Sequence, residues 1–165
     1  MITLRHAEPT DLSAIADLLY EVEHFYGTVE CPPRPQWEQQ IASLLFSDTP
    51  AARVLLAIED DAPLGFASYS LLWPATGVSK SLFLKELYIR ESYRRRGIGE
   101  ILMSRLCSIA VETGSSRLEW ATDAENIGAQ KFYEKLGDVR TPTKIMYRAE
   151  GADLIRLSKL HPTRG

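Results

Sequence analysis

Three runs rich in apolar, β-branched and aromatic residues follow one another between residues 53 and 89, with short turns between them. They read RVLLAI at 53–58, LGFASYSLLW at 64–73 and SLFLKELYI at 81–89. Runs of this kind, interrupted by turn residues, are typical of antiparallel strands that are neighbours in one sheet. We therefore expect the middle of the chain to form a sheet whose strands follow directly in sequence.

Helical patterns precede this sheet segment. From Leu12 to Tyr26 apolar residues recur at spacings of three and four, and Thr10 or Asp11 is available as the cap. A second helix is expected after the Pro-rich stretch ECPPRP, with Pro35 in its first turn. The residues expected to face inward on this second helix are Trp37, Ile41, Leu44 and Leu45.

The remaining elements alternate between helix and strand. They are expected to be helices over 97–113 and 126–137, strands at 117–122 and 143–148, and a short helix within 152–160. With a first strand in MITLRHA, the order becomes βααβββαβαβ followed by the short helix. This order predicts an α/β (α+β) fold with a mixed, mostly antiparallel sheet covered by helices on both faces. No linker interrupts the chain, so a single domain over residues 1–165 is expected.

The charge and hydropathy of the chain exclude several function classes. The formal net charge is -3, whereas binding to nucleic-acid phosphates needs a broad basic surface. No apolar run approaches the about 20 residues of a membrane span, and the N-terminus lacks the layout of a signal peptide. Cys31 and Cys107 lack metal-ligand spacing, so no metal is expected. We expect no nucleic-acid partner, no membrane and a cytoplasmic location, and the sequence is compatible with a homodimer.

The stretch YRRRGIG at 93–99 concentrates positive charge at the start of the helix expected over 97–113. A helix N-terminus has unpaired N–H groups and about half a positive charge, so it favours anions. Gly97 and Gly99 allow a ligand to approach the backbone, and guanidinium groups suit phosphate oxygens. The pattern indicates a pyrophosphate site, with a solvated basic turn as the alternative.

Two motifs carry a resemblance to a known family. LKELYIRESYRRRGIGEILM resembles the acetyl-CoA motif of the GNAT superfamily of N-acetyltransferases, with Arg94, Gly97 and Gly99 at the matching positions. NIGAQKFYEKLG resembles a later helix of that family, and its matching residues are Asn126, Ala129, Phe132, Tyr133 and Gly137. GFASYSLLW, LKELYI and LEWATDAEN are similar to the diamine acetyltransferase-like branch, although Lys85-Glu86 stands where that branch commonly has Glu-Asp.

The resemblance implies acetyl-CoA as the cosubstrate. In the family the pantetheine arm lies along the strand before the pyrophosphate turn, which here implies main-chain contacts to Leu87, Tyr88 and Ile89. Many members have Pro where Glu91 stands, which affects the loop but removes no phosphate donor. The full set of expected cofactor-binding residues is Leu87, Tyr88, Ile89, Arg94, Arg95, Arg96, Gly97, Ile98, Gly99, Glu100 and Asn126.

Acetyl transfer to an amine needs a neutral amine and a proton for the leaving thiolate. An amine with a pKa of about 10.4 is protonated near pH 7, so a base assists the reaction. Strand alternation puts Glu86 on one face with Tyr88, and Glu86 is the candidate base, with His24 or water as alternatives. The resemblance implies Tyr133 as the general acid, against a plain core tyrosine, and Asn126 as a pantetheine contact, against a helix cap.

The acceptor side is expected at the first two helices, because the resemblance implies that they cover the acceptor. The expected substrate-binding residues are Glu21, His24 and Tyr26, and Trp37 is either a lining or a core residue. Lys85 weakens attraction for a polycation, so a small amine, an amino acid or an amine-bearing antibiotic competes with a diamine.

Together these features predict an acetyl-CoA-dependent N-acetyltransferase, an acyltransferase that modifies a primary amine of a small molecule by direct attack. The alternatives are a protein or peptide N-acetyltransferase and a non-catalytic acyl-CoA-binding module.

Overall fold

The computed structural model describes residues 1–28, 30–137 and 139–160. The chain forms two compact units, Met1–Glu125 and Asn126–Gly165. All five strands belong to the first unit, and two short helices belong to the second. The expectation of a single domain over 1–165 stays a prediction.

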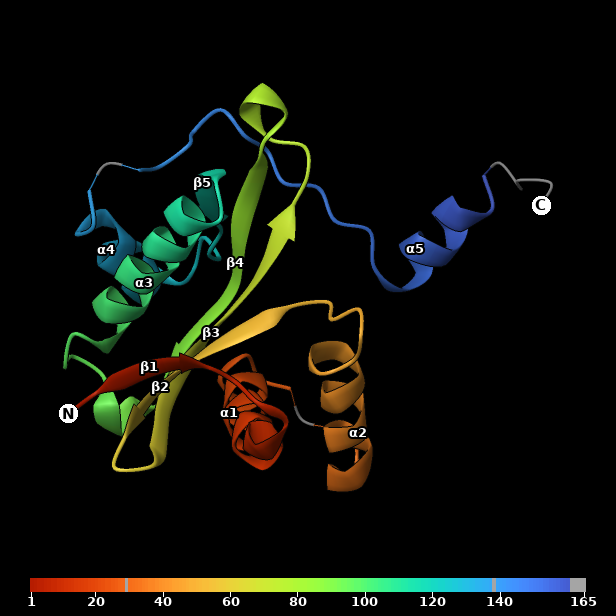
Figure 1. The fold of residues 1–165 in the computed structure, drawn as a ribbon. Coiled ribbons are helices and arrows are strands. Elements are labelled where there is room, and N and C mark those ends of the chain that lie inside the picture. The colour runs from red at the N-terminus through yellow and green to blue at the C-terminus, as the bar shows by residue number, and fades with distance from the viewer. Residues whose placement is uncertain (29, 138, 161–165) are drawn as a thin grey trace. The chain divides into compact units, whose positions relative to one another are not determined.

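A five-stranded sheet forms the centre of the first unit (Figure 1). Its order is β1-β2-β3-β4-β5, and all neighbours are antiparallel except β4 and β5, which are parallel. The strands are β1 (Thr3–His6), β2 (Arg53–Glu59), β3 (Ala62–Leu72), β4 (Lys80–Ile89) and β5 (Ser115–Trp120). The three successive strands expected between residues 53 and 89 are thus confirmed, and so is the mixed, mostly antiparallel fold class.

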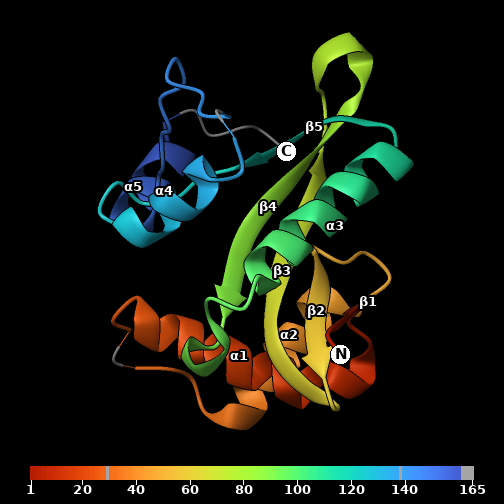
Figure 2. The same ribbon diagram turned by 90° about the vertical axis from the view of Figure 1, so that its left-hand side faces the viewer.

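Helices cover both faces of this sheet (Figures 1 and 2). On one face lie α1 (Leu12–Phe25) and α2 (Arg34–Leu45), and on the other lies α3 (Ile98–Glu112). The helix α3 connects β4 to β5, as a parallel strand pair requires. Short 3-10 turns occur at Pro9–Asp11, Thr76–Val78 and Glu91–Tyr93.

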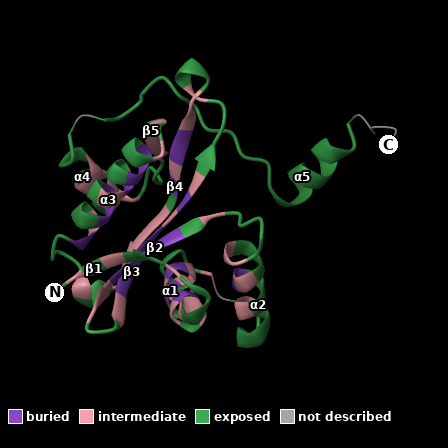
Figure 3. Cartoon of the chain, in the orientation of Figure 1, coloured by how far each residue is buried: buried purple, intermediate pink, exposed green. Residues whose placement is uncertain are grey.

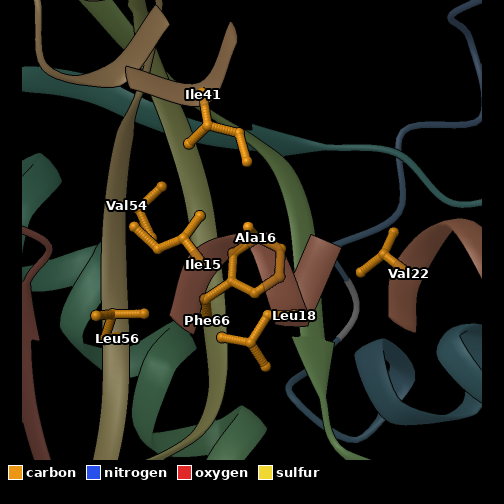
Figure 4. Packing of buried hydrophobic residues seen from close by; sticks show 8 residues of the cluster. All are labelled: Ile15, Ala16, Leu18, Val22, Ile41, Val54, Leu56 and Phe66. Carbon is orange, nitrogen blue, oxygen red and sulfur yellow. The ribbon is translucent and has the colours of Figure 1, made fainter. Parts of the chain in front are cut away.

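Buried apolar side chains join the sheet to these helices (Figure 3). The cluster beneath α1 and α2 consists of Ile15, Ala16, Leu18, Val22, Ile41, Val54, Leu56 and Phe66 (Figure 4). On the other side, α3 contributes residues with no more than 1% exposure: Ile98, Leu102 and Leu106. Because side chains of β2 alternate between the two faces, Val54 and Leu56 belong to one layer and Leu55 to the other.

Two details of the first helices differ from the sequence expectation. Asp11 precedes α1, but its carboxylate makes no cap bond to that helix; it accepts from Glu8 N at 2.8 Å and from Arg5 at 2.6 and 2.7 Å. On α2, Ile41 is buried and Trp37 and Leu45 pack against the cluster, whereas Leu44 is 55% exposed. The expected inward position of Leu44 is therefore wrong, because the helix turns that residue away from α1.

The second unit contains α4 (Ile127–Glu134) and α5 (Gly151–Ser158), which confirms both expected helices. The strand expected at 143–148 is wrong, since the described residues form no strand there. Its apolar residues Ile145, Met146 and Tyr147 are at least 64% exposed. A short apolar run alone does not make a strand, because a strand also needs a neighbour to complete its hydrogen bonds.

The strands β3 and β4 approach closely at Gly65, which lies opposite Ile89. A Cβ atom at Gly65 would meet the carbonyl oxygen of Tyr88 and would lie 2.7 Å from Cδ1 of Ile89. This position therefore has no room for a side chain unless the two strands separate. Among the described helices, none has the length and apolar content needed to cross a membrane.

Candidate active site

The turn before α3 has the backbone of an anion site. Gly97 is the N-cap of α3 and adopts a left-handed conformation with φ of 77°, and a Cβ there would meet no atom within 4 Å. The first intrahelical bond at this end runs from Ile101 N to Gly97 O at 3.1 Å. The amides of Ile98, Gly99 and Glu100 therefore belong to the first turn, where N–H groups lack helical acceptors.

The three arginines of this turn have different surroundings. Arg94 donates through Nε to the carbonyl oxygen of Ile89 at 3.0 Å. Arg96 is bonded to Glu59 at 2.7 Å and lies over the Tyr93 ring at 5.6 Å. Arg95 has a φ of 61° and makes no hydrogen bond or ion pair with the residues that the structure describes. The cluster is thus partly engaged within the protein, and only Arg95 is wholly solvated.

Among the residues that the structure describes, the C-terminal half of β4 has a neighbouring strand on one side only. From Glu86 to Ile89 it pairs with β3, whereas its pairing with β5 ends at Leu84 and Trp120. Lys85 is an extra residue in the register, because Ser68 faces Glu86 while Tyr69 faces Leu84. Such bulges re-aim neighbouring side chains, and here the bulge comes directly before the unpaired edge.

Glu86 is half-buried beside the end of α1. The hydroxyl of Tyr26 lies 3.5 Å from its Oε1, at the outer limit of a hydrogen bond. Burial raises the pKa of the Glu86 carboxyl, and the nearby Lys85 cation and the Tyr26 contact oppose that rise. Burial likewise raises the pKa of Tyr26, with further contributions from Glu86 and Asp123.

Glu21 links α1 to the same strand. It accepts a hydrogen bond of 3.1 Å from the Tyr88 hydroxyl, and its Oε1 lies 3.0 Å from Arg90 Nε in an ion pair too bent for a hydrogen bond. Burial raises the pKa of Tyr88, and the bond to Glu21 raises it further. Since Tyr88 and Glu86 both reach α1, the expected alternation on β4 is confirmed.

His24 lies on the exposed side of α1. Its Nδ1 is 3.1 Å from the carbonyl oxygen of Tyr20, and its ring is 4.3 Å from the Tyr20 ring. These contacts stay within one turn of the helix. The structure therefore brings Glu21 and Tyr26 to β4, whereas His24 is held by its own helix.

Two expected site residues belong to the second unit. Asn126 caps α4, because its side-chain oxygen accepts from Ala129 N at 3.0 Å, so the capping alternative is correct for that oxygen. Tyr133 lies in the last turn of α4, with its ring 5.1 Å from Phe132 in an edge-on contact.

A hollow of about 360 Å³ lies elsewhere in the first unit, bordered by His6, Leu45 and Arg53 among others. None of the expected site residues lines it. The site is therefore defined by the edge of β4 and the turn before α3 rather than by this hollow. No cluster of metal-ligating side chains occurs among the described residues.

Sequence reasoning missed three residues of this region. Phe25 lies over the guanidinium of Arg94, Arg90 pairs with Glu21, and Glu59 holds Arg96. Each partner pair is far apart in sequence, so only the folded arrangement reveals it. The one available signal was the aromatic pair Phe25-Tyr26 at the end of an otherwise amphipathic helix.

Residues 16–138 match the model of the acetyltransferase (GNAT) family, which is more than half of the chain. The chain belongs to the GNAT acetyltransferase family. It is accordingly an N-acetyltransferase of the kind that uses acetyl-CoA as cosubstrate, as the sequence resemblance implied.

The chain is also similar to individual proteins and to a solved structure. A D-amino-acid N-acetyltransferase of Saccharomyces cerevisiae is 28% identical over 156 residues, or 91% of each chain. An L-ornithine N5-acetyltransferase of Arabidopsis thaliana is 30% identical over 80 residues, which are 48% of this chain and 35% of that protein. An integron cassette protein from the mobile metagenome of V. cholerae superposes with a TM-score of 0.84 and 31% identity, covering 96% of this chain and 98% of that one.

Proposed function

We propose that the chain transfers an acetyl group from acetyl-CoA to a primary amine of a small molecule by direct attack, with Glu86 as base and Tyr133 as general acid. The observation that carries this proposal is a half-buried carboxyl of raised pKa beside the unpaired edge of a strand. In a GNAT enzyme this edge and the turn after it are the expected cofactor region.

Glu86 has the properties of a base for an ammonium substrate. Its raised pKa makes the carboxylate a stronger proton acceptor than an exposed glutamate. Asp123 adds negative charge near both Glu86 and Tyr26, which favours the approach of a cation. The proton leaves the amine nitrogen for a Glu86 oxygen, directly or through a water.

The residues around the α3 turn fit a pyrophosphate-bearing cosubstrate. Gly97 is open above its backbone, the first-turn amides of α3 are unused within the helix, and Arg94 and Arg95 add positive charge. Leu87, Tyr88 and Ile89 would offer backbone groups on the side of β4 that has no strand. When bound, acetyl-CoA supplies the activated acetyl group as a thioester.

Arg96 belongs to this region in a supporting role. Its guanidinium is bonded to Glu59, and that hydrogen bond lowers the pKa of the Glu59 carboxyl. We propose that it contributes charge to the turn rather than a direct phosphate contact.

Tyr133 is proposed to protonate the departing sulfur. A phenol with a pKa near 10 suits donation to a thiolate of pKa about 8.5. The support is its position in the second GNAT motif and its place on α4, whose start is fixed by the Asn126 cap.

The acceptor is proposed to be a small amine such as an amino acid. The yeast relative is named for D-amino acids and the plant relative for L-ornithine, and both kinds of compound carry a primary amine. Glu21 and Tyr26 are proposed to line the acceptor side from α1. A cytoplasmic location and a homodimer complete the proposal, on the sequence arguments given above.

A panel of amines, amino acids, aminoglycosides and N-terminal peptides, assayed with acetyl-CoA by thiol release, tests this function. We expect turnover with a small primary amine and little with peptides. Turnover with peptides alone would establish the protein acetyltransferase instead. Acetyl-CoA binding without turnover on any acceptor would establish a non-catalytic module.

A further inference from the structure

The position of Phe25 is not explained by core packing. It ends α1, its side chain is 54% exposed, and it is absent from the buried cluster beneath that helix. Its ring contacts Tyr26, edge-on at 5.2 Å, and the guanidinium of Arg94, whose Cζ lies 5.7 Å from the ring centroid. The largely exposed ring of Phe25 therefore contacts a cation, Arg94, that is far away in the sequence.

Arg94 contacts a second ring as well. Its Cζ is also 5.7 Å from the centroid of Tyr88, and its Nε donates to the carbonyl oxygen of Ile89. Both ring distances lie within the range of cation–π attraction. The rings come from α1 and β4, so two separate elements converge on one guanidinium at the turn before α3.

Of the N–H groups of this guanidinium, the Nε–H is engaged, because it donates to the carbonyl oxygen of Ile89. A cation–π contact uses the flat face of the group, whereas a phosphate binds its N–H edge. Arginine has many rotamers. If they are restricted before a ligand arrives, binding loses less side-chain conformational entropy. Aromatic faces that hold the cation in one place therefore favour anion binding without touching the anion.

We propose that Phe25 is a positioning residue for the cosubstrate: its ring holds the Arg94 guanidinium at the pyrophosphate turn and thereby connects the last turn of α1 to that turn. This inference rests on the proposed function, since it takes Arg94 as a pyrophosphate ligand. It adds a residue on the acceptor helix that acts on cosubstrate affinity through another side chain.

Acetyl-CoA binding measured by calorimetry tests this, without need of turnover. Phe25→Leu keeps apolar bulk but removes the ring face, and we expect about a 2- to 5-fold higher Kd, the scale of an exposed cation–π contact. Phe25→Trp should bind as well as the wild type or better. In an Arg94→Ala background, which itself weakens binding, Phe25→Leu should change the Kd no further.

Tyr20→Leu is the matched control, because Tyr20 is a similarly exposed aromatic residue of α1, at 50%, that contacts His24 instead. It should leave the Kd unchanged. If the wild type and Arg94→Ala differ but Phe25→Leu binds like the wild type, the inference is overturned and the proposed function stands. An equal loss in both backgrounds overturns it too, since the effect would not pass through Arg94. A wild-type protein that does not bind acetyl-CoA would instead overturn the proposed function.

Discussion

The hydroxyl of Tyr26 lies 3.5 Å from Oε1 of Glu86, although the two residues are 60 positions apart in the chain. Tyr26 is the C-cap that follows α1, and Glu86 follows the bulge in β4. The arrangement puts the Tyr26 hydroxyl next to the Glu86 carboxyl, which is partly buried. The same burial that raises the pKa of Glu86 makes it useful as a base and costly to keep ionised.

Glu86→Gln should lower the rate of amine acetylation by about 100-fold at pH 7, because the amide accepts no proton. The deficit should shrink toward pH 10, where free amine becomes abundant without help. Steady-state kinetics between pH 6 and pH 10 measure this, with the surface variant Glu38→Gln as control. A deficit that is constant over the whole range would assign Glu86 a structural role.

The same Glu86→Gln variant should be more stable than the wild type at pH 7. Because the pKa of Glu86 is raised on folding, its stabilising contribution is present at acid pH and is lost as pH rises through that raised value. Glutamine does not ionise, so the melting temperature at pH 7 should rise, and the gain should vanish below about pH 4. Thermal melts at both pH values check the sign.

Gly97→Glu should abolish measurable acetyl-CoA binding, since it adds negative charge and bulk to the proposed phosphate site. Gly114→Glu is a matched control, because Gly114 also has positive φ, at 68°, with no atom within 4 Å of a built Cβ. Both variants should lose about 1 kcal/mol of stability from backbone strain. Calorimetry should separate them, and equal affinity in the two variants would remove Gly97 from the site.

Tyr133→Phe should reduce kcat by about 100-fold or more while the KM for acetyl-CoA changes little. The substitution keeps the ring and removes only the proton donor, which acts in the transition state. A good acceptor from the amine panel is needed for the comparison. Wild-type turnover in the Phe variant would mean that water or another group protonates the sulfur.

Asp11→Asn should destabilise the first unit by about 1 kcal/mol at pH 7, the scale of a paired, charge-assisted contact near the surface. The Arg5 bond lowers the pKa of Asp11, so its contribution is present above the unfolded value and is lost as pH falls through the lowered one. Urea denaturation should therefore give the wild type and the variant similar stabilities near pH 2.

Local patterns were enough to predict most of the fold. Apolar runs bounded by turn residues located β2, β3 and β4, and the spacing of apolar residues located α1 and α3, since each signal comes from the element itself. The segment at 143–148 also contains an apolar run, but no strand that the structure describes pairs with it, and no local pattern reports such a partner. The prediction that Leu44 faces inward was wrong for a related reason. The side of α2 that meets α1 depends on how the two helices pack.

The candidate site also has features that local sequence predicts and features that depend on how distant segments pack. The glycine at the start of α3 and the shared face of Glu86 and Tyr88 follow from turn and strand geometry, and the sequence predicted both. The ion pair between Arg96 and Glu59 could not be predicted from the sequence, because it depends on the position of β2 next to the turn. Charge counting treated the three arginines as equivalent, whereas folding pairs Arg94 with Ile89 and Arg96 with Glu59 and gives Arg95 no such partner among the described residues.

Gly65 limits how this protein can vary. Since even a methyl group there would strike the backbone of Tyr88 and the side chain of Ile89, every substitution displaces the strand edge proposed to receive the cosubstrate. In a library of random variants selected for acetylation, we expect glycine alone to survive at position 65, while exposed positions such as Leu44 accept many residues. A site far from any reacting atom would thus be among the least replaceable in the gene.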